Sequence, residues 1–181
     1  MGGNALKNTN TRRYNSDEYF KLFQVIGAQI CDHVVQFGLI KSYRNKDTFG
    51  DMDILYVHNG TINMRDVVTS LFNPNEIVVN GDVMSFNVEE LQVDLIKVNL
   101  EEYDFAMKYF SYNDLGNLIG RVAHKLGLKF GRKGLLYVYR KNDKILGEVT
   151  ITNDLIKLLV SVDMILITME ISNHLKISSI S

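Results

Sequence analysis

The sequence predicts an α+β fold, either as one domain or as one compact body of two small lobes. Apolar positions at helical spacing alternate along the chain with β-branched runs that end at turn residues. The 181 residues are 46% apolar and 23% charged, with thirteen glycines and one proline, which excludes collagen-like, proline-rich and wholly disordered classes. One cysteine and four scattered histidines offer neither a disulfide nor zinc-binding spacing.

The N-terminal half is expected to combine one long helix with short strands. Residues 1–15 are polar and predict a flexible arm. Ser16 is expected to cap a helix that ends near Gly38, followed by a strand at 39–43. The apolar face of this helix is expected to carry Phe20, Phe23, Gly27, Ile30 and Val34. The later elements expected in this half are a strand at 51–57 and a helix at about 63–72.

The second half is expected to continue with strands, then helices and a hairpin region. Runs at 76–80 and 83–98 predict antiparallel strands, residues 101–110 and 114–126 predict helices, and 128–149 predict a hairpin region. A last helix is expected to begin at Thr152 or Asn153. The expected divisions are an arm (1–15), a mixed α/β part (16–104), a helix-hairpin lobe (105–160) and a C-terminal segment without an assigned role (161–181).

The net charge of −1 conceals an uneven distribution along the chain. Residues 66–104 hold nine carboxylates and one basic side chain, whereas residues 121–144 hold eight basic side chains and one carboxylate. This asymmetry is typical of a protein that holds a cation at one place and a polyanion at another, although two solvated faces produce the same pattern.

A membrane span and a secretory signal are not expected. The most apolar stretch, 155–171, contains Lys157, Asp163 and Glu170, whereas a spanning helix needs about 20 residues nearly free of charge. The N-terminus lacks a basic segment followed by an apolar one. We therefore expect a cytoplasmic location, which for a phage-encoded protein is the cytoplasm of the host.

Asp51 and Asp53 are the first residues that suggest chemistry, because they begin a strand that then becomes apolar. Side chains two apart on a strand point to the same face, so both carboxylates project together. Hard cations such as Mg²⁺ prefer carboxylate oxygen, and a pair of such ions needs a further carboxylate. Asp94 is a candidate because it interrupts an apolar strand, where a lone acid is costly unless it is paired or coordinated. An Asp-x-Asp pair by itself is more often a solvated strand end.

A polar loop precedes these acids. Residues 42–50 (SYRNKDTFG) offer a hydroxyl group, two cations and a glycine. Phosphate oxygens accept hydrogen bonds from such groups, and Gly50 allows the backbone to pass close to a metal or a phosphate. The loop and the following Asp-Met-Asp-Ile-Leu resemble the active-site signature of the polymerase beta-like nucleotidyltransferases, the superfamily that includes the family X DNA polymerases.

The resemblance continues downstream in the same order. Residues 93–95 are similar to the segment with the family's third catalytic Asp, and residues 109–121 are similar to its nucleotide-binding helix segment. Residues 125–135 and 145–148 resemble the lobe that follows, so the likeness covers about residues 40–160. It implies a palm with a mixed sheet and flanking helices, followed by a small helix-hairpin lobe.

The resemblance also implies roles for single residues. Asp51, Asp53 and Asp94 would be the catalytic residues and would hold two Mg²⁺ ions, or Mn²⁺ in their place, with Asp94 assisting deprotonation of a primer 3′-hydroxyl. The nucleoside triphosphate would be bound by Ser42, Arg44, Gly50, Asp114 and Asn117. Nucleic acid would be contacted by Arg121 and by the basic residues after it, Lys125, Lys129, Arg132 and Lys133.

The chain departs from the family's pattern at several positions. Lys41 stands where the family has a glycine, the loop is about one residue shorter, and Gln92 replaces a common Arg two residues before the third Asp. Residues 111–113 replace a turn that contains glycine. The binding of triphosphate and the discrimination of its sugar therefore do not follow from the resemblance.

Three functions remain open on the sequence. The first is transfer of a nucleotidyl group from an NTP or dNTP to a hydroxyl, with a DNA or RNA end as acceptor and release of pyrophosphate. The second keeps this chemistry but uses a transfer RNA, a protein or a small molecule as acceptor. The third is a catalytically degenerate module that binds nucleic acid through residues 121–144.

Overall fold

A computed structural model describes residues 5–43, 45–112, 114–142, 144–154, 157–158 and 160. It confirms the α+β class, with a mixed sheet and flanking helices. The chain forms two compact units, Met1–Leu115 and Gly116–Ser181. The expected boundary at residue 104 lies before helix α3 (Tyr103–Phe110) has ended, and this helix belongs to the first unit because it packs against the first unit's sheet.

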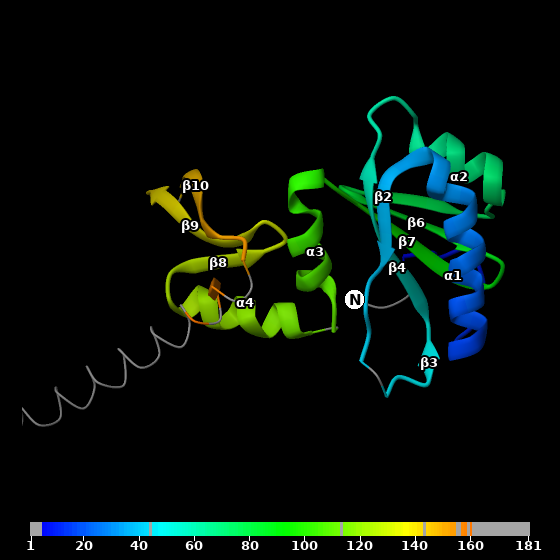
Figure 1. Ribbon diagram of the computed structural model, residues 1–181, viewed down its shortest axis with the longest axis horizontal. Helices are drawn as coiled ribbons and strands as arrows, with labels where there is room; N and C mark the ends of the chain where they lie inside the picture. Colours follow the sequence, from blue (N-terminus) through cyan, green and yellow to red (C-terminus); the bar gives the residue numbers. More distant parts are fainter. Residues whose placement is uncertain are drawn as a thin grey trace, which may run out of the picture. The chain divides into compact units, whose positions relative to one another are not determined.

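The first unit is built on a five-stranded sheet with the order β2-β4-β7-β6-β5 (Figure 1). Strands β4 and β7 run parallel, and the other neighbours run antiparallel. The strands are β2 (Val34–Leu39), β4 (Asp51–His58), β5 (Ile77–Asn80), β6 (Val83–Val88) and β7 (Leu91–Val98). Beside this sheet, β1 (Tyr14–Asn15) pairs antiparallel with β3 (Thr48–Phe49).

Helices cover both faces of the sheet (Figure 1). On one face, Ile54 of β4 packs in a core with helices α1 (Ser16–Ile30) and α2 (Met64–Phe72). On the other face, Leu55 and Val57 pack against α3. Because side chains alternate along a strand, Asp51 and Asp53 lie on the α3 side of the sheet.

A capping box begins α1. The Glu18 backbone N–H donates to the Asn15 side chain at 3.0 Å, and the Asn15 backbone N–H donates to the Glu18 carboxylate at 3.0 Å. The expected cap at Ser16 is therefore wrong by one residue. Asn and Ser are equally good caps, but Asn15 has a Glu three residues later, which completes the motif.

The end of α1 also differs from the expectation. The helix ends at Ile30 and a 3₁₀ turn follows, so residues 34–39 form β2, and neither a helix to Gly38 nor a strand at 39–43 is present. Tertiary pairing decides this, because Val34 to Leu39 form a ladder with β4 that helical periodicity does not reveal.

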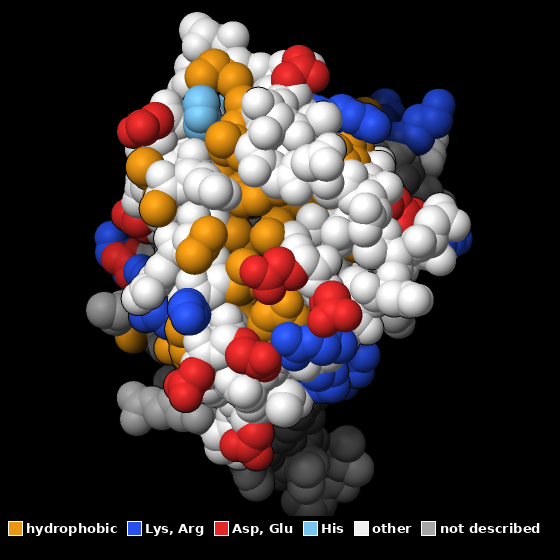
Figure 2. All heavy atoms as spheres, turned by 90° about the vertical axis from the view of Figure 1, so that its right-hand side faces the viewer, with side chains coloured by type: hydrophobic (Ala, Val, Ile, Leu, Met, Phe, Trp, Pro, Cys, Tyr) orange, Lys and Arg blue, Asp and Glu red, His pale blue; other side chains and the backbone are white. Residues whose placement is uncertain are grey.

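The buried face of α1 is rotated from the expected one. Phe20, expected in the core, is 50% exposed, whereas Gly27 and Ile30 are buried as expected. The buried positions of the helix are Tyr19, Leu22, Ile26, Gly27 and Ile30. Figure 2 shows apolar side chains among charged ones on the face to the right of Figure 1, and Phe20 and Val25 of α1 are exposed apolar residues.

The other elements of the first unit largely agree with the sequence. The expected strands at 51–57 and 76–80 are confirmed as β4 and β5, and the expected helices at 63–72 and 101–110 as α2 and α3. The run 83–98 is two strands rather than one. It turns at Glu89 and Glu90, where Glu89 adopts a positive φ of 50°. Glycine and asparagine adopt this conformation more often than glutamate, so the sequence does not mark the turn.

Residues 5–15, which we call the N-terminal strap, are hydrogen-bonded along their length rather than forming the expected flexible arm. The backbone N–H groups of Lys7 and Asn8 donate to the Glu76 carboxylate at 3.0 and 2.8 Å. Farther along, the Arg12 backbone N–H donates to the Glu90 carbonyl at 2.8 Å. Polar composition predicted an arm because it does not reveal such long-range partners.

The second unit combines helix α4 (Leu115–Lys125) with three antiparallel strands in the order β10-β9-β8. The strands are β8 (Leu128–Gly131), β9 (Gly134–Lys141) and β10 (Lys144–Thr152), which confirm the expected hairpin region and helix at 114–126. Ala123, Phe130 and Leu135 are among its buried residues. The expected last helix and the segment 161–181 fall mainly outside the described residues, and Thr152 itself belongs to β10.

Within the described parts of the chain, we find no helix that is long and apolar enough to cross a membrane.

Candidate metal centre

Three carboxylates meet at the start of the parallel strand pair. Asp51 and Asp53 come from β4 and Asp94 comes from β7. One carboxylate oxygen of each lies within 4.8 Å of those of the other two, and all three side chains are half-buried. The geometry thus brings together the three acids that the sequence singled out, in an arrangement that could hold a metal ion.

The parallel register explains why Asp94 reaches the Asp51 and Asp53 pair. Asp53 is the direct partner of Asp94, and Asp51 is the partner of Gln92. On the other side of β7, Ser85 of β6 is the antiparallel partner of Asp94. Paired residues project to the same face of a sheet, so Asp53, Asp94 and Ser85 form a row across three strands.

Burial and mutual repulsion change the protonation of this cluster. The pKa of Asp53 is raised to about 7, first by burial and then by the negative charges of Asp51 and Asp94. The positive charge of Lys46 opposes this increase. A carboxylate with so high a pKa is poorly compensated by its neighbours, which is the electrostatic condition that a bound divalent cation relieves.

Asp94 is half-buried and is also held by hydrogen bonds. Burial raises the pKa of its carboxyl group, hydrogen bonds from the Ser85 and Gln92 side chains lower it, and the charge of Asp51 raises it. The Gln92 side chain donates from Nε2 to Asp94 Oδ1 at 2.9 Å. These donors favour the ionised carboxylate in one orientation, which is the form that ligates a metal.

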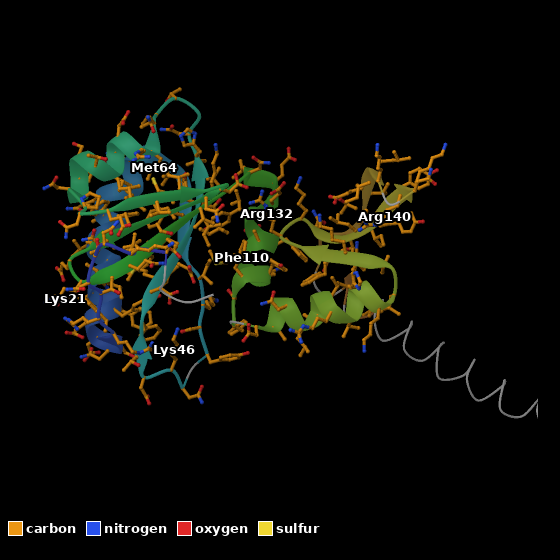
Figure 3. All side chains as sticks on the ribbon, turned by 180° about the vertical axis from the view of Figure 1, so that it is seen from behind. Lys21, Lys46, Met64, Phe110, Arg132 and Arg140 are labelled. Atoms are coloured by element: carbon orange, nitrogen blue, oxygen red, sulfur yellow. The ribbon has the colours of Figure 1, made fainter. Side chains whose placement is uncertain are left out.

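The loop before β4 brings one cation, Lys46, whose positive charge acts on Asp53. Lys46 Nζ lies 4.9 Å from the ring centroid of Phe49, in a cation–π contact. Figure 3 shows Lys46 on the loop before β4. The Phe49 ring stacks on Tyr19 of α1 with centroids 4.0 Å apart. Burial, followed by the negative charges of Asp53 and Asp51, raises the pKa of the Tyr19 hydroxyl, and Tyr19 itself packs in the core on the α1 side of the sheet.

The residues expected to bind triphosphate do not all lie in one part of the described structure. Gly50 directly precedes Asp51 and is half-buried, as is Ser42. The loop begins next to the end of α3, because the Tyr112 N–H donates to the Lys41 carbonyl at 2.6 Å. Arg44 lies outside the described residues, and Asp114 is exposed near the end of the first unit.

The remaining predicted residues belong to the second unit. Asn117, Arg121 and Lys125 are exposed on α4 at a spacing of four residues, which places them on one side of the helix. Lys129 forms an ion pair with Glu148, with Nζ to Oε1 at 2.7 Å. After β8, Arg132 is half-buried and Lys133 is exposed.

Sequence reasoning missed the roles of Gln92 and Ser85 in this site. Gln92 could have been found, because it is two residues from Asp94 on a strand and must share its face. Ser85 gives no local signal, because its position beside Asp94 depends on strand pairing. Lys46 was noted only as one of two loop cations.

No protein-family model matches this chain, and no curated protein matches its sequence.

Proposed function

We propose that this protein is a metal-dependent nucleotidyltransferase with a polymerase beta-like palm, which transfers a nucleotidyl group from an NTP or dNTP to a hydroxyl and releases pyrophosphate. The observation that carries the proposal is the convergence of Asp51, Asp53 and Asp94 on one face of two parallel strands. The resemblance of residues 40–160 to the polymerase beta-like nucleotidyltransferases supports the same reaction. The proposed acceptor is the 3′ end of DNA or RNA.

The donor set fits Mg²⁺, or Mn²⁺ in its place. Carboxylate oxygens are the ligands that hard divalent cations prefer, and Asp51, Asp53 and Asp94 offer them from a rigid sheet. Burial first, and then the negative charges of Asp51 and Asp94, raise the pKa of Asp53, and a bound divalent cation would offset these effects. When bound, a pair of such ions activates the attacking hydroxyl and stabilises the leaving phosphate.

Side chains in and around the cluster are proposed to accept the hydroxyl proton and to bind the triphosphate. The attacking hydroxyl oxygen forms a bond to the α-phosphorus, the bond from phosphorus to the bridging oxygen breaks, and pyrophosphate leaves. Asp94 is proposed to accept the hydroxyl proton, because burial raises the pKa of its carboxyl group and makes it a better base. Ser42 and Lys46, on the loop before β4, are proposed to bind the triphosphate oxygens.

Primer extension with each triphosphate, with and without template, tests this function. Asp53→Asn and Asp94→Asn should each lower the rate at least about 100-fold, because each removes a negative ligand from the reacting centre. Circular dichroism should show that both variants keep the fold. Asp66→Asn is the control and should retain the wild-type rate, since Asp66 is exposed on α2, on the opposite face of the sheet. Full activity of Asp53→Asn or Asp94→Asn contradicts the mechanism.

The same labelled triphosphate identifies the acceptor. Incubation with nucleic acid, with protein and with neither should give labelled nucleic acid alone if the proposed acceptor is correct. Label on protein, or on a small molecule, keeps the chemistry but replaces the acceptor. If transfer RNA is the one nucleic acid that becomes labelled, the acceptor is a transfer RNA.

A nucleic-acid-binding module without catalysis is the second candidate, and the basic side chains of the second unit favour it. Arg121, Lys125 and Lys133 are exposed there and could neutralise phosphates. Calorimetry separates the two functions. If nucleic acid binds but no nucleoside triphosphate binds in the presence of Mg²⁺ or Mn²⁺, the binding module replaces the enzyme.

A further inference from the structure

Gln92 connects the candidate metal centre to the N-terminal strap. Its side chain is buried, with 1% of the residue exposed. The carboxamide oxygen Oε1 accepts hydrogen bonds from the backbone N–H groups of Ala5 at 3.0 Å and of Leu6 at 3.4 Å. The carboxamide nitrogen Nε2 donates to Asp94 Oδ1 at 2.9 Å. One buried amide thus contacts two segments that lie more than eighty residues apart in the sequence.

The hydrogen bonds from the strap determine which way this amide points. A primary amide has an acceptor end and a donor end, and rotation of its last torsion by half a turn exchanges them. With Oε1 occupied by two backbone N–H groups, Nε2 faces Asp94 and donates to it. Without the strap, either end could face the carboxylate, and the oxygen end would repel it.

The strap is anchored at its ends and in between. Near its beginning, Glu76 accepts hydrogen bonds from the backbone N–H groups of Lys7 and Asn8. In the middle, the Arg12 guanidinium pairs with Glu90 at 2.9 Å and with Glu18 at 3.0 Å.

The end of the strap reaches the loop before β4. Arg13 donates to the Thr48 hydroxyl at 2.9 Å and to the Thr48 carbonyl at 2.7 Å. Tyr14 of β1 pairs with Phe49 of β3, directly before Gly50 and Asp51. The strap therefore contacts both chain segments that bring carboxylates into the site.

We propose that Gln92 is a positioning residue that holds the Asp94 carboxylate in its metal-ligating orientation, and that the N-terminal strap is part of the metal centre because it fixes the Gln92 amide. The inference rests on the proposed function, since it concerns the same metal site. It goes beyond that function by assigning a role in metal binding to residues 5–15, which contain no Asp, Glu, His or Cys.

Binding of Mn²⁺ to the full chain, measured by electron paramagnetic resonance, tests this inference without any need for activity. Gln92→Met keeps the length of the side chain but removes both its donor and its acceptor. We expect its Mn²⁺ dissociation constant to rise about tenfold, the size typical of a lost partner of a metal ligand. Glu76→Ala loosens the strap at its half-buried Glu76 anchor and leaves Gln92 in place, and we expect a smaller rise of the dissociation constant than in Gln92→Met.

Asn63→Ala is the control for a general loss of stability. Asn63 caps α2 and accepts a hydrogen bond from the Arg65 N–H at 3.1 Å, so its loss lowers stability by about 1 kcal/mol away from the site. This variant should bind Mn²⁺ like the wild type, although it melts at a lower temperature.

The possible outcomes separate the inference from the proposed function. Wild-type affinity in Gln92→Met, or an equal loss in Asn63→Ala, overturns the positioning role while the metal site stands. Wild-type affinity in Glu76→Ala overturns the role of the strap. A wild-type chain that binds no Mn²⁺ overturns the proposed function, and this inference with it.

Discussion

Of the three acids in the site, Asp53 is the one whose electrostatics most affect the stability of the folded protein. Its half-buried side chain lies with those of Asp51 and Asp94, and its pKa is raised from 3.8 to about 7. In the unfolded chain this carboxyl group loses its proton near pH 4, whereas in the folded protein it keeps the proton until about pH 7. The folded state therefore binds more protons between these pH values, and its stability falls as the pH rises.

The metal-free protein should lose stability between about pH 4 and pH 7, by at most about 4 kcal/mol from Asp53. Asp53→Asn removes the titrating group, so at pH 8 without metal it should melt at a higher temperature than the wild type. Addition of Mg²⁺ should raise the melting temperature of the wild type and have little effect on the variant. Thermal unfolding followed by circular dichroism at several pH values measures all three effects.

Asp47→Asn provides the matched control for this prediction. Asp47 is exposed in the loop before β4, so the same chemical change there should leave the melting temperature nearly unchanged. A wild-type protein whose stability rises between pH 4 and pH 7, compared with Asp53→Asn, would contradict the assigned electrostatics.

At the scale of elements, the second unit depends on a glycine at the start of β9. Gly134 has a φ of +120°, and a Cβ at this position would lie 2.3 Å from the Thr152 carbonyl oxygen of β10. Both the backbone conformation and the close approach of the neighbouring strand require the absence of a side chain. The two strands can pair over their whole length only if this position remains glycine.

Gly134→Ala should therefore lower the free energy of unfolding by about 2 kcal/mol or more, through backbone strain and the displacement of β10. Gly131→Ala, on the adjacent strand, is the control. No atom lies within 4 Å of a Cβ built there, so its effect should stay within about 1 kcal/mol. Chemical denaturation with urea measures both, and equal effects of the two substitutions would remove the special role of Gly134.

At the scale of the whole molecule, the two units carry opposite kinds of charge. The carboxylates Asp51, Asp53 and Asp94 belong to the first unit, and the exposed bases Arg121, Lys125 and Lys133 belong to the second. Under the proposed function, the first unit holds the cation and the second unit neutralises phosphates of the nucleic acid. This division agrees with the charge asymmetry along the sequence.

The salt dependence of nucleic-acid binding tests the role of the second unit. Lys125→Ala should weaken binding similarly for different sequences and reduce the slope of log K against log salt by about one. Lys21→Ala is the control, because Lys21 is an exposed lysine on α1 of the first unit (Figure 3). Fluorescence anisotropy at several salt concentrations gives both slopes, and equal slopes for Lys125→Ala and the wild type would exclude a phosphate contact.

Local patterns were sufficient for much of the first unit. The apolar run after Asp53 predicted the strand β4, and the helix expected at about 63–72 is α2. They failed at α1, where the helical periodicity continued into residues that pair as β2, and at Glu89, where a turn forms without glycine. In both places, strand pairing overrides the local preference.

The sequence by itself determined that two carboxylates share one side of a strand, because the two-residue period of a β-strand is a local property. It also identified Asp94 as a buried acid that needs a partner. Only the tertiary structure decided that Asp94 meets the other two, because this depends on the parallel register of β4 and β7. The connection from Asp94 through Gln92 to the N-terminal strap was decided in the same way, since hydrogen bonds between distant segments form only when folding brings those segments together.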